Sequence, residues 1–229
     1  MREVAIKPVD SWWTVLFIDP IAVRILPFLL RFRWIDANVV TGVAFVVGCG
    51  AIVLFATGQF VIGAVLYELR FLLDCLDGKI ARVRRTSSPL GAAFDRTADS
   101  LTIPAAFAAI GITLAHHGHL RPVLALAPAL MSSMVTVLEL SLELLVRRTN
   151  SSGQAELFGH GGVASWFRRH RLTLRPWTVE AEALGLFIAP IALTGDLLGD
   201  AELAIAAVFA VFVLVDLFMI ARTAARPAP

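Results

Sequence analysis

The sequence predicts an all-α integral membrane protein with six transmembrane helices and an N-terminal amphipathic helix at the membrane interface. Of the 229 residues, 58% are hydrophobic, and the mean hydropathy is +0.77. Soluble domains are only about 45–50% apolar. Six apolar segments, each long enough for a membrane helix, alternate with polar segments, and a segment rich in tryptophan, phenylalanine and arginine precedes them. This length suits one helical bundle without a large extramembrane domain.

Residues 1–35 are predicted to form a cytoplasmic amphipathic arm. Within it, residues 11–34 mix aromatic, aliphatic and arginine side chains, and Pro20 and Pro27 interrupt them. This composition is typical of a helix that lies in the interface, with its aromatic rings at the acyl boundary and its arginines near lipid phosphates. A short transmembrane helix is the alternative for this segment. The arginines concerned are Arg24, Arg31 and Arg33.

The six apolar segments predict spans over 37–57, 60–83, 90–115, 121–146, 179–196 and 200–221. Asp36 can cap the first helix. A polar turn, 84–89, joins the second span to the third, and the longest polar stretch, 147–177, joins the fourth to the fifth. Residues 36–222 would then form one six-helix transmembrane domain, and 223–229 a short cytoplasmic tail.

The distribution of positive charge predicts the orientation of these spans. Arginine and lysine are concentrated in the arm, in the second-to-third and fourth-to-fifth connections, and in the tail. The opposite face has Arg121 and three acidic residues, Asp196, Asp200 and Glu202. By the positive-inside rule both termini face the cytoplasm. We therefore expect an integral protein of the cell (plasma or inner) membrane.

Four aspartates lie where the second span ends and the third begins. Asp74 and Asp77 are three residues apart, and Asp95 and Asp99 are four apart. On an α-helix these steps turn about 300° and 400°, so each pair lies on one helix face. Two such faces turned toward each other make an oxygen-only site for one or two hard divalent cations, Mg²⁺ or Mn²⁺. The alternative is four separately satisfied polar residues at a membrane boundary.

The aspartates belong to a longer pattern, Asp-x2-Asp-Gly-x2-Ala-Arg-x8-Gly-x3-Asp-x3-Asp, over residues 74–99. This pattern resembles the signature of the CDP-alcohol phosphotransferase (CDP-alcohol phosphatidyltransferase) family at all its fixed positions. The six spans and the amphipathic arm resemble that family's architecture as well. The resemblance implies a transferase that acts at the cytoplasmic face, with residues 36–222 as its catalytic domain, and it implies a homodimer.

The resemblance also implies roles for individual residues. Asp74, Asp77 and Asp95 would be metal ligands, and Asp99 would be the general base that also touches a second metal ion. Gly78 and Gly91 lack a Cβ and would leave room for a nucleotide between the helices. Tight helix packing is the alternative for each glycine taken singly. The remaining nucleotide or phosphate residues of the motif are Asp77 again, Ala81, which keeps the same face shallow, and Arg82, which can reach a phosphate.

The segment 36–41 resembles the family's Pro-Asn-x-x-Thr at the start of the first helix, with Ala37 in place of the proline. Asn38 and Thr41 would then line the donor site. A polar helix start without a role in binding explains these two residues equally well.

Four further ionisable residues are candidates for an acceptor pocket. Arg70 lies one turn before Asp74 and either binds a substrate anion or pairs with one of the carboxylates. Glu139, Glu143 and Arg147 share a face of the fourth span. They form either a helical salt-bridge ladder or a wall of the acceptor pocket. Acidic residues here favour a neutral or amino-bearing acceptor over a phosphorylated one.

The predicted reaction moves a substituted phosphate from a CDP-linked alcohol to an acceptor hydroxyl and releases CMP, as in phospholipid biosynthesis. CDP-diacylglycerol is the expected donor, and membrane lipid, not nucleic acid, is the expected environment and partner. The alternative is a soluble CDP-alcohol donor with a lipid or small polar acceptor. A cation transporter is a more distant alternative, because the carboxylates cluster at one membrane face and do not form a path across the bilayer. A prenyltransferase has no use for Gly78 and Arg82 at these offsets.

Overall fold

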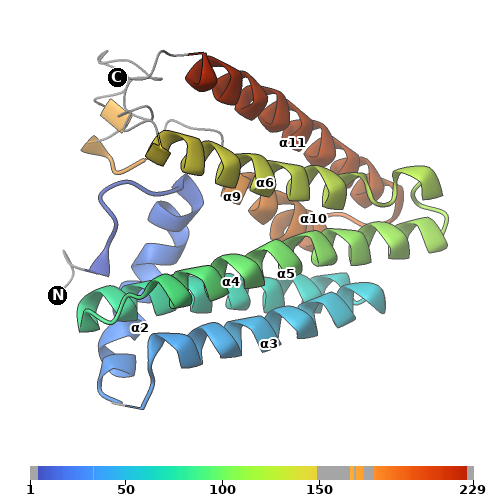
Figure 1. Cartoon of the computed structure of the whole chain (residues 1–229). Helices are drawn as coiled ribbons and strands as arrows, with labels where there is room; N and C mark the ends of the chain where they lie inside the picture. The colour runs from blue at the N-terminus through green and yellow to red at the C-terminus, as the bar shows by residue number, and fades with distance from the viewer. Residues whose placement is uncertain (1–4, 33, 149–165, 168, 173–177, 226–229) are drawn as a thin grey trace.

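The computed structural model describes residues 5–32, 34–148, 166–167, 169–172 and 178–225, without the side chains of 146–148 (Figure 1). Most of the polar stretch 147–177, Arg33 and the end of the tail lie outside these residues. The described chain is almost entirely helical. Its elements are η1 (Thr14–Ile18), α2 (Asp19–Leu30), α3 (Ala37–Ala56), α4 (Phe60–Arg84), α5 (Pro89–His116), η2 (Pro122–Leu124), α6 (Ala127–Arg148), α9 (Thr178–Ala183), η3 (Leu184–Ile188), α10 (Ala189–Ala192) and α11 (Gly195–Ala224).

Local sequence signals account for where these helices begin. The Asp36 carboxylate accepts a hydrogen bond from the backbone N–H of Ala37 at 2.8 Å, which confirms the predicted cap of α3. Ser88 caps α5 in the same way, with its hydroxyl 3.0 Å from the N–H of Gly91. Pro89 follows at the first helical position, where a missing N–H costs nothing.

The last two predicted spans differ most from the structure. The helix predicted over 179–196 ends at Ala192 because Leu193 is extended, and α11 begins at Gly195, whose φ is +58°. The helix predicted from residue 200 therefore starts five residues earlier. Asp196 is the last residue of the predicted fifth span, but it occupies the first turn of α11, where a negative charge favours the helix.

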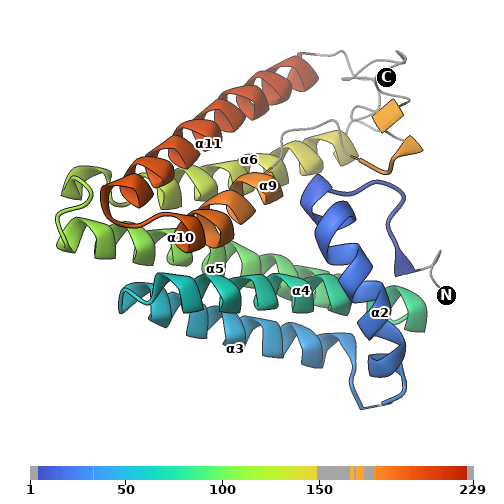
Figure 2. The ribbon, with the colours of Figure 1, turned by 180° about the vertical axis from the view of Figure 1, so that it is seen from behind.

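The helices form two groups joined by a short helical segment. Helix α3 packs against both α4 and α5, and α6 pairs with α11. The segment α9–η3–α10 lies between them and contacts both α4 and α11, as the reverse view shows (Figure 2). Helix α2 crosses α4 at the end of the bundle where α11 ends.

Four segments among the described residues are long and apolar enough to cross a membrane: α3, α5, Pro122–Leu145 and α11. Their outward side chains are apolar, with Val46 69% and Leu214 66% exposed. Exposed aliphatic rows of this kind suit contact with lipid, and the protein is accordingly an integral membrane protein. Helix α4 has 25 residues but carries several ionisable residues, among them Asp74, Asp77 and Arg82 of the motif.

Aromatic packing and one glycine hold the far end of the bundle together. Phe107 of α5 and Phe209 of α11 are fully buried, and their rings meet edge to face with centroids 5.7 Å apart. A Cβ at Gly111 would overlap the carbonyl oxygen of Ala125. Only glycine therefore allows this close approach between α5 and the start of the α6 region.

The N-terminal segment is attached to the end of the bundle by a buried ion triad. Asp19 of α2 contacts Lys79 of α4 at 2.8 Å and Arg171 at 2.9 Å. Burial alone would raise the pKa of the Asp19 carboxyl, but hydrogen bonds from Lys79 and Arg171 outweigh it, so the pKa lies below its ordinary value. The triad joins α2 and residue 171 to the helix that carries Asp74 and Asp77.

Candidate active site

Three aspartates from two neighbouring helices come together near the end of the bundle that α2 covers. Asp74 of α4 and Asp95 and Asp99 of α5 each offer a carboxylate oxygen, and these oxygens lie within 4.8 Å of one another. The cluster follows from the sequence spacing, because Asp95 and Asp99 are one turn apart on the face of α5 that meets α4. All three side chains are half-buried.

The cluster has the properties of a cation site. The Oδ1 atom of Asp95 is buried and has no hydrogen-bond partner among the described residues. A buried carboxylate oxygen without a partner carries a large desolvation cost, which a bound cation would offset. The donors are carboxylate oxygens, the ligands that Mg²⁺ and Mn²⁺ prefer. The residues present therefore fit a divalent cation.

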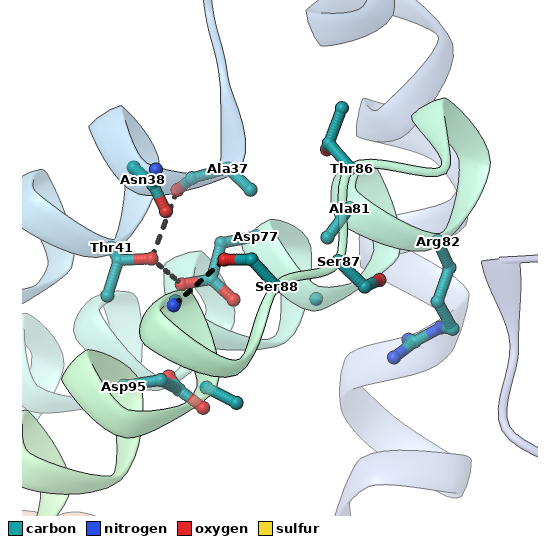
Figure 3. Close-up of a pocket in the computed structure, with 13 residues that line it drawn as sticks. Ala37, Asn38, Thr41, Asp77, Ala81, Arg82, Thr86, Ser87, Ser88 and Asp95 are labelled. Carbon is teal, nitrogen blue, oxygen red and sulfur yellow. Dashed lines mark hydrogen bonds between the residues drawn. The ribbon is translucent and has the colours of Figure 1, made fainter.

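Asp77 lies one turn beyond Asp74 and has a different partner. Its Oδ2 atom is 2.5 Å from the Thr41 hydroxyl of α3, and both side chains are buried (Figure 3). The contact joins the first turn of α3 to the motif on α4. Asp77 is not one of the three aspartates with converging oxygens, but it lines a cleft beside Asp95.

This cleft, here called the first cleft, has a volume of about 170 Å³. Figure 3 shows Asn38, Thr41 and Asp77 on one side of it and Arg82 on the other. Every residue predicted to bind nucleotide or phosphate lines it: Asn38, Thr41, Asp77, Gly78, Ala81, Arg82 and Gly91. Thr86, Ser87 and Ser88 of the turn between α4 and α5 also line it, and the sequence had not singled them out.

The two motif glycines have different surroundings. A Cβ at Gly91 would lie 3.2 Å from the Ser88 hydroxyl and 3.4 Å from the Asn38 side-chain oxygen. At Gly78 a Cβ would meet only the guanidinium end of Arg82, at 3.4 Å. Gly91 is thus a position where α5 lies close to the start of α3. The Arg82 side chain is held by a residue that does not line the cleft, because its Nε donates a hydrogen bond to the carbonyl oxygen of Ala5 at 2.9 Å.

Arg70 is buried, with 3% of its surface exposed, and its guanidinium forms an ion pair with Asp99. Of the two roles considered for Arg70, pairing with a carboxylate is therefore the one present in the structure. The Tyr67 ring lies beneath the same guanidinium, 5.7 Å from its carbon to the ring centroid. Asp99 is therefore the member of the cluster that is ion-paired with a cation of α4.

A second cleft, of about 340 Å³, is lined by Asp99 from the cluster and by residues of α4, α5, α6 and α9. Glu139 and Glu143 line it, and their role in an acceptor pocket stays a prediction. Glu143 pairs with Arg96 of α5 at 3.1 Å. The side chain of Arg147 lies outside the described residues. Since Asp95 lines the first cleft and Asp99 the second, the carboxylate cluster lies at the boundary between the two.

The sequence did not single out Glu182 and Arg96, which also line the second cleft. Glu182 could have been found, because it is an ionisable residue inside the predicted fifth span, where such a residue is a functional candidate by default. Arg96 follows Asp95 directly in the motif, but its contact with Glu143 depends on how α5 packs against α6.

Comparison with known proteins agrees with this geometry. The model of the CDP-alcohol phosphatidyltransferase family matches residues 34–214, which include both clefts and the whole motif. The chain belongs to the CDP-alcohol phosphatidyltransferase family. It is therefore a transferase of a family that depends on divalent metal ions, and membrane character and phospholipid biosynthesis go with that membership.

Two relatives of this family member can be compared in more detail. The archaetidylinositol phosphate synthase of Methanothermobacter thermautotrophicus is 31% identical over 179 residues, 75% of this chain and 84% of that protein. The crystal structure of Mycobacterium tuberculosis phosphatidylinositol phosphate synthase with CDP-DAG bound matches with a TM-score of 0.62 at 24% identity, covering 88% of this chain and 94% of that one. Its apo form matches with a TM-score of 0.56 at 21% identity. These structures share the fold.

Proposed function

We propose that this enzyme transfers a phosphatidyl group from CDP-diacylglycerol to the hydroxyl group of an acceptor and releases CMP. The observation that carries the proposal is the position of the carboxylate cluster at the boundary of two clefts. Transfer between two substrates requires both to reach one reactive centre from different sides. The first cleft would hold the cytidine diphosphate, and the second the acceptor.

The first cleft has groups that suit a nucleotide diphosphate. Arg82 supplies a positive charge, and Ser87 and Ser88 supply hydroxyl groups. Gly78, Ala81 and Gly91 keep its walls shallow. Asn38 and Thr41 would contact the nucleotide from α3. The solved relative with CDP-DAG bound supports a CDP-linked lipid as the donor.

The divalent cation would be held by Asp74, Asp95 and Asp99, with Asp77 contributing from the first cleft; two ions, Mg²⁺ or Mn²⁺, are proposed. When bound, the metal neutralises pyrophosphate charge and stabilises the CMP leaving group. The cluster supports this role through the unpartnered Oδ1 atom of Asp95.

The protein's own residues would carry the proton. The carboxylate of Asp99 accepts the proton of the acceptor hydroxyl while that oxygen forms a bond to the phosphorus that bears diacylglycerol. The bond from this phosphorus to the bridging oxygen breaks, and the oxygen leaves with CMP. The Arg70 guanidinium orients Asp99 through their ion pair. Proton transfer of this kind accelerates a reaction by about 10²–10⁴-fold.

The membrane arrangement we propose has six spans, with α4 and the segment α9–η3–α10 added to the four apolar helices. Residues 36–222 would form the catalytic domain, and its site would face the cytoplasm in the cell membrane, where soluble substrates are available. The arm, 1–35, would lie in the interface beside the first cleft, which suits a lipid donor; Phe17 and Phe28 of η1 and α2 are more than half exposed. A homodimer is proposed from the family.

The proposed reaction is tested by CMP release from the purified full chain in lipid nanodiscs with Mg²⁺. Donors would be CDP-diacylglycerol and CDP-choline. Acceptors would be small alcohols, their phosphates and diacylglycerol; the names of the relatives make inositol phosphate one of them. We expect CMP only with CDP-diacylglycerol. CMP release from CDP-choline with diacylglycerol, and not from CDP-diacylglycerol, would contradict the proposal and support the soluble-donor alternative.

A further inference from the structure

Two basic residues of α4, three positions apart, contact the N-terminal arm. Lys79 is 3% exposed and forms an ion pair with Asp19 at 2.8 Å. Arg82 follows one turn later, and its Nε atom donates a hydrogen bond to the carbonyl oxygen of Ala5 at 2.9 Å. Gly78, the neighbour of Lys79, lines the first cleft together with Arg82. The arm therefore contacts α4 beside the residues that line this cleft.

Ala5 is held in place by packing against its neighbours. Its surface is fully buried, and it belongs to a cluster of buried apolar residues that also contains Ile18 of η1 and Leu76 and Ile80 of α4. Protein interiors are close-packed, so a residue in such a cluster has little freedom to move. The packing therefore fixes the position of the Ala5 carbonyl oxygen relative to α4.

A segment far along the chain holds the same part of the arm. The backbone N–H of Asp10 donates to the carbonyl oxygen of Arg171 at 3.0 Å, and the Arg171 guanidinium donates to the carbonyl oxygen of Lys7 at 2.9 Å. Arg171 also pairs with Asp19 at 2.9 Å. The start of the arm is thus attached both to α4 and to residue 171.

The contact with Ala5 leaves the phosphate-binding end of Arg82 available. A guanidinium has five N–H donors in one plane, and Ala5 takes the single donor on Nε. The four donors on Nη1 and Nη2 can bind two phosphate oxygens side by side. Nη1 lies 3.4 Å from the place of a Cβ at Gly78, so these atoms lie next to a glycine that keeps the cleft wall shallow.

From these contacts we propose that the N-terminal arm positions Arg82 for the phosphates of the CDP-linked donor. The inference rests on the proposed function, in which the first cleft holds the cytidine diphosphate. The Ala5 carbonyl fixes Nε of Arg82, and the Asp19–Lys79 ion pair holds the arm against α4 one turn away. A long side chain that is already immobilised loses less conformational freedom when it binds a ligand. Ala5 and Asp19 are positioning residues and do not touch the donor.

Two variants of the full chain loosen the arm at different points. Ala5→Leu puts a larger side chain into a fully buried position and should displace the carbonyl from Arg82. Asp19→Asn weakens the attachment one turn away. The Kd of CDP would be measured by isothermal titration in nanodiscs with Mg²⁺, since CDP carries no lipid. We expect each variant to raise this Kd by about tenfold, the upper range for ordering one long side chain. An unchanged Kd in both variants would overturn the inference.

Two controls separate positioning from a general loss of stability. Phe209→Leu at the other end of the bundle should lower the Tm, because the ring is fully buried, and should leave the Kd of CDP unchanged. Arg24→Gln removes a charge from the arm at an exposed position whose hydrogen bond is to Pro20 of the same helix, and it should also leave the Kd unchanged. A rise in Kd with Phe209→Leu equal to that with Ala5→Leu would mean that reduced stability is the cause.

A double-mutant cycle shows whether the arm acts through Arg82. Arg82→Gln should itself raise the Kd of CDP, and adding Ala5→Leu to Arg82→Gln should then have little further effect, because the positioned group is gone. If Ala5→Leu raises the Kd by the same factor in both backgrounds, the arm does not position Arg82, and the inference is wrong.

Turnover separates this inference from the proposed reaction. With CDP-diacylglycerol as donor, Ala5→Leu should raise KM and leave kcat nearly unchanged, because the groups that take part in the chemical step are not altered. A lower kcat at an unchanged KM would refute the positioning role. If the wild type binds CDP but releases no CMP with any donor and acceptor, the proposed function fails, and the double-mutant cycle still decides the role of the arm.

Discussion

The guanidinium of Arg70 is ion-paired with the carboxylate of Asp99, which lines the second cleft. Arg70 is almost fully buried, so this charge is supplied from inside the bundle and not from solvent. The pairing distinguishes Asp99 from Asp95, whose Oδ1 has no partner among the described atoms. The two aspartates of α5 thus differ in their surroundings, because Asp99 has a cationic partner and Asp95 has a buried oxygen without a hydrogen-bond partner among the described residues.

The first prediction concerns Asp99. Asp99→Asn should lower kcat by about 10²–10⁴-fold, because the amide cannot accept the acceptor's proton. CDP binding, measured by isothermal titration with Mg²⁺ present, should change little. Asp74→Asn is the comparison and should weaken metal and nucleotide binding together. An equal loss of CDP affinity in both variants would show that Asp99 acts mainly as a metal ligand.

The second prediction concerns the metal ion. Saturation at 100 times Kd stabilises a folded protein by about 2.7 kcal/mol, so Mg²⁺ or Mn²⁺ should raise the Tm in detergent and a chelator should reverse it. Asp95→Asn should raise the Tm without metal, because one repelling charge is removed, and should reduce the response to metal. A wild-type Tm that stays constant across millimolar Mg²⁺ and Mn²⁺ would argue against the site.

The third prediction concerns the close approach at Gly91. Gly91→Val should reduce CDP affinity, because even a Cβ there lies 3.2 Å from Ser88 and 3.4 Å from Asn38. The stabilisation by Mg²⁺ should persist, since no charge is changed. Gly42→Ala on α3 is the control, because a Cβ at Gly42 meets nothing within 4 Å. Unchanged CDP binding in Gly91→Val would place the nucleotide outside the first cleft.

The fourth prediction concerns pH and Asp19. Its pKa is lower in the folded protein than in the unfolded chain, so its ion pairs stabilise the fold above the ordinary pKa of 3.8 and this stabilisation is lost as pH falls through the folded value. Removing one member of a buried ion pair costs about 3–5 kcal/mol. Asp19→Asn should therefore lower the Tm at pH 7.

The same series of melting curves provides the check on Asp19. The difference in Tm between wild type and Asp19→Asn should begin to shrink as pH falls below 3.8, where Asp19 of the unfolded chain takes up a proton, and should become small below the lower pKa of the folded protein, where Asp19 is neutral in both states. Asp200→Asn, at an exposed position of α11, is the control and should follow the wild type. A Tm difference that is the same at pH 7 and at pH 3 would exclude the ion pairs as its cause.

The sequence was sufficient to predict most helices. The bounds of α4 and α5 agree with the predicted 60–83 and 90–115 within one residue, because the apolar runs are long and Ser88-Pro89 marks a helix start. The start of α11 could not be predicted from the apolar pattern in the same way. Asp196 and Asp200 are polar in either a loop or a first helical turn, so hydropathy did not distinguish the two.

The candidate site was predictable where it depends on helix spacing. The approach of Asp74 to Asp95 and Asp99 follows from their register on two adjacent helices. The second cleft depends instead on the packing of α5, α6 and α9, which no local pattern specifies. Glu182 was therefore not predicted as a site residue, although an ionisable residue inside an apolar span indicates a functional position. The roles assigned to the motif residues stay predictions.

The ion triad at Asp19 has a consequence for the order in which the chain assembles. Asp19 reaches Arg171, and the backbone of Trp12 reaches Glu180 across 168 positions of sequence. These partners leave the ribosome long after the arm. The N-terminal arm can therefore complete its contacts only after α9 has been synthesised. During that interval Lys79 and Asp19 can already pair, so the motif helix would receive its first contact with the arm before the rest of the active site exists.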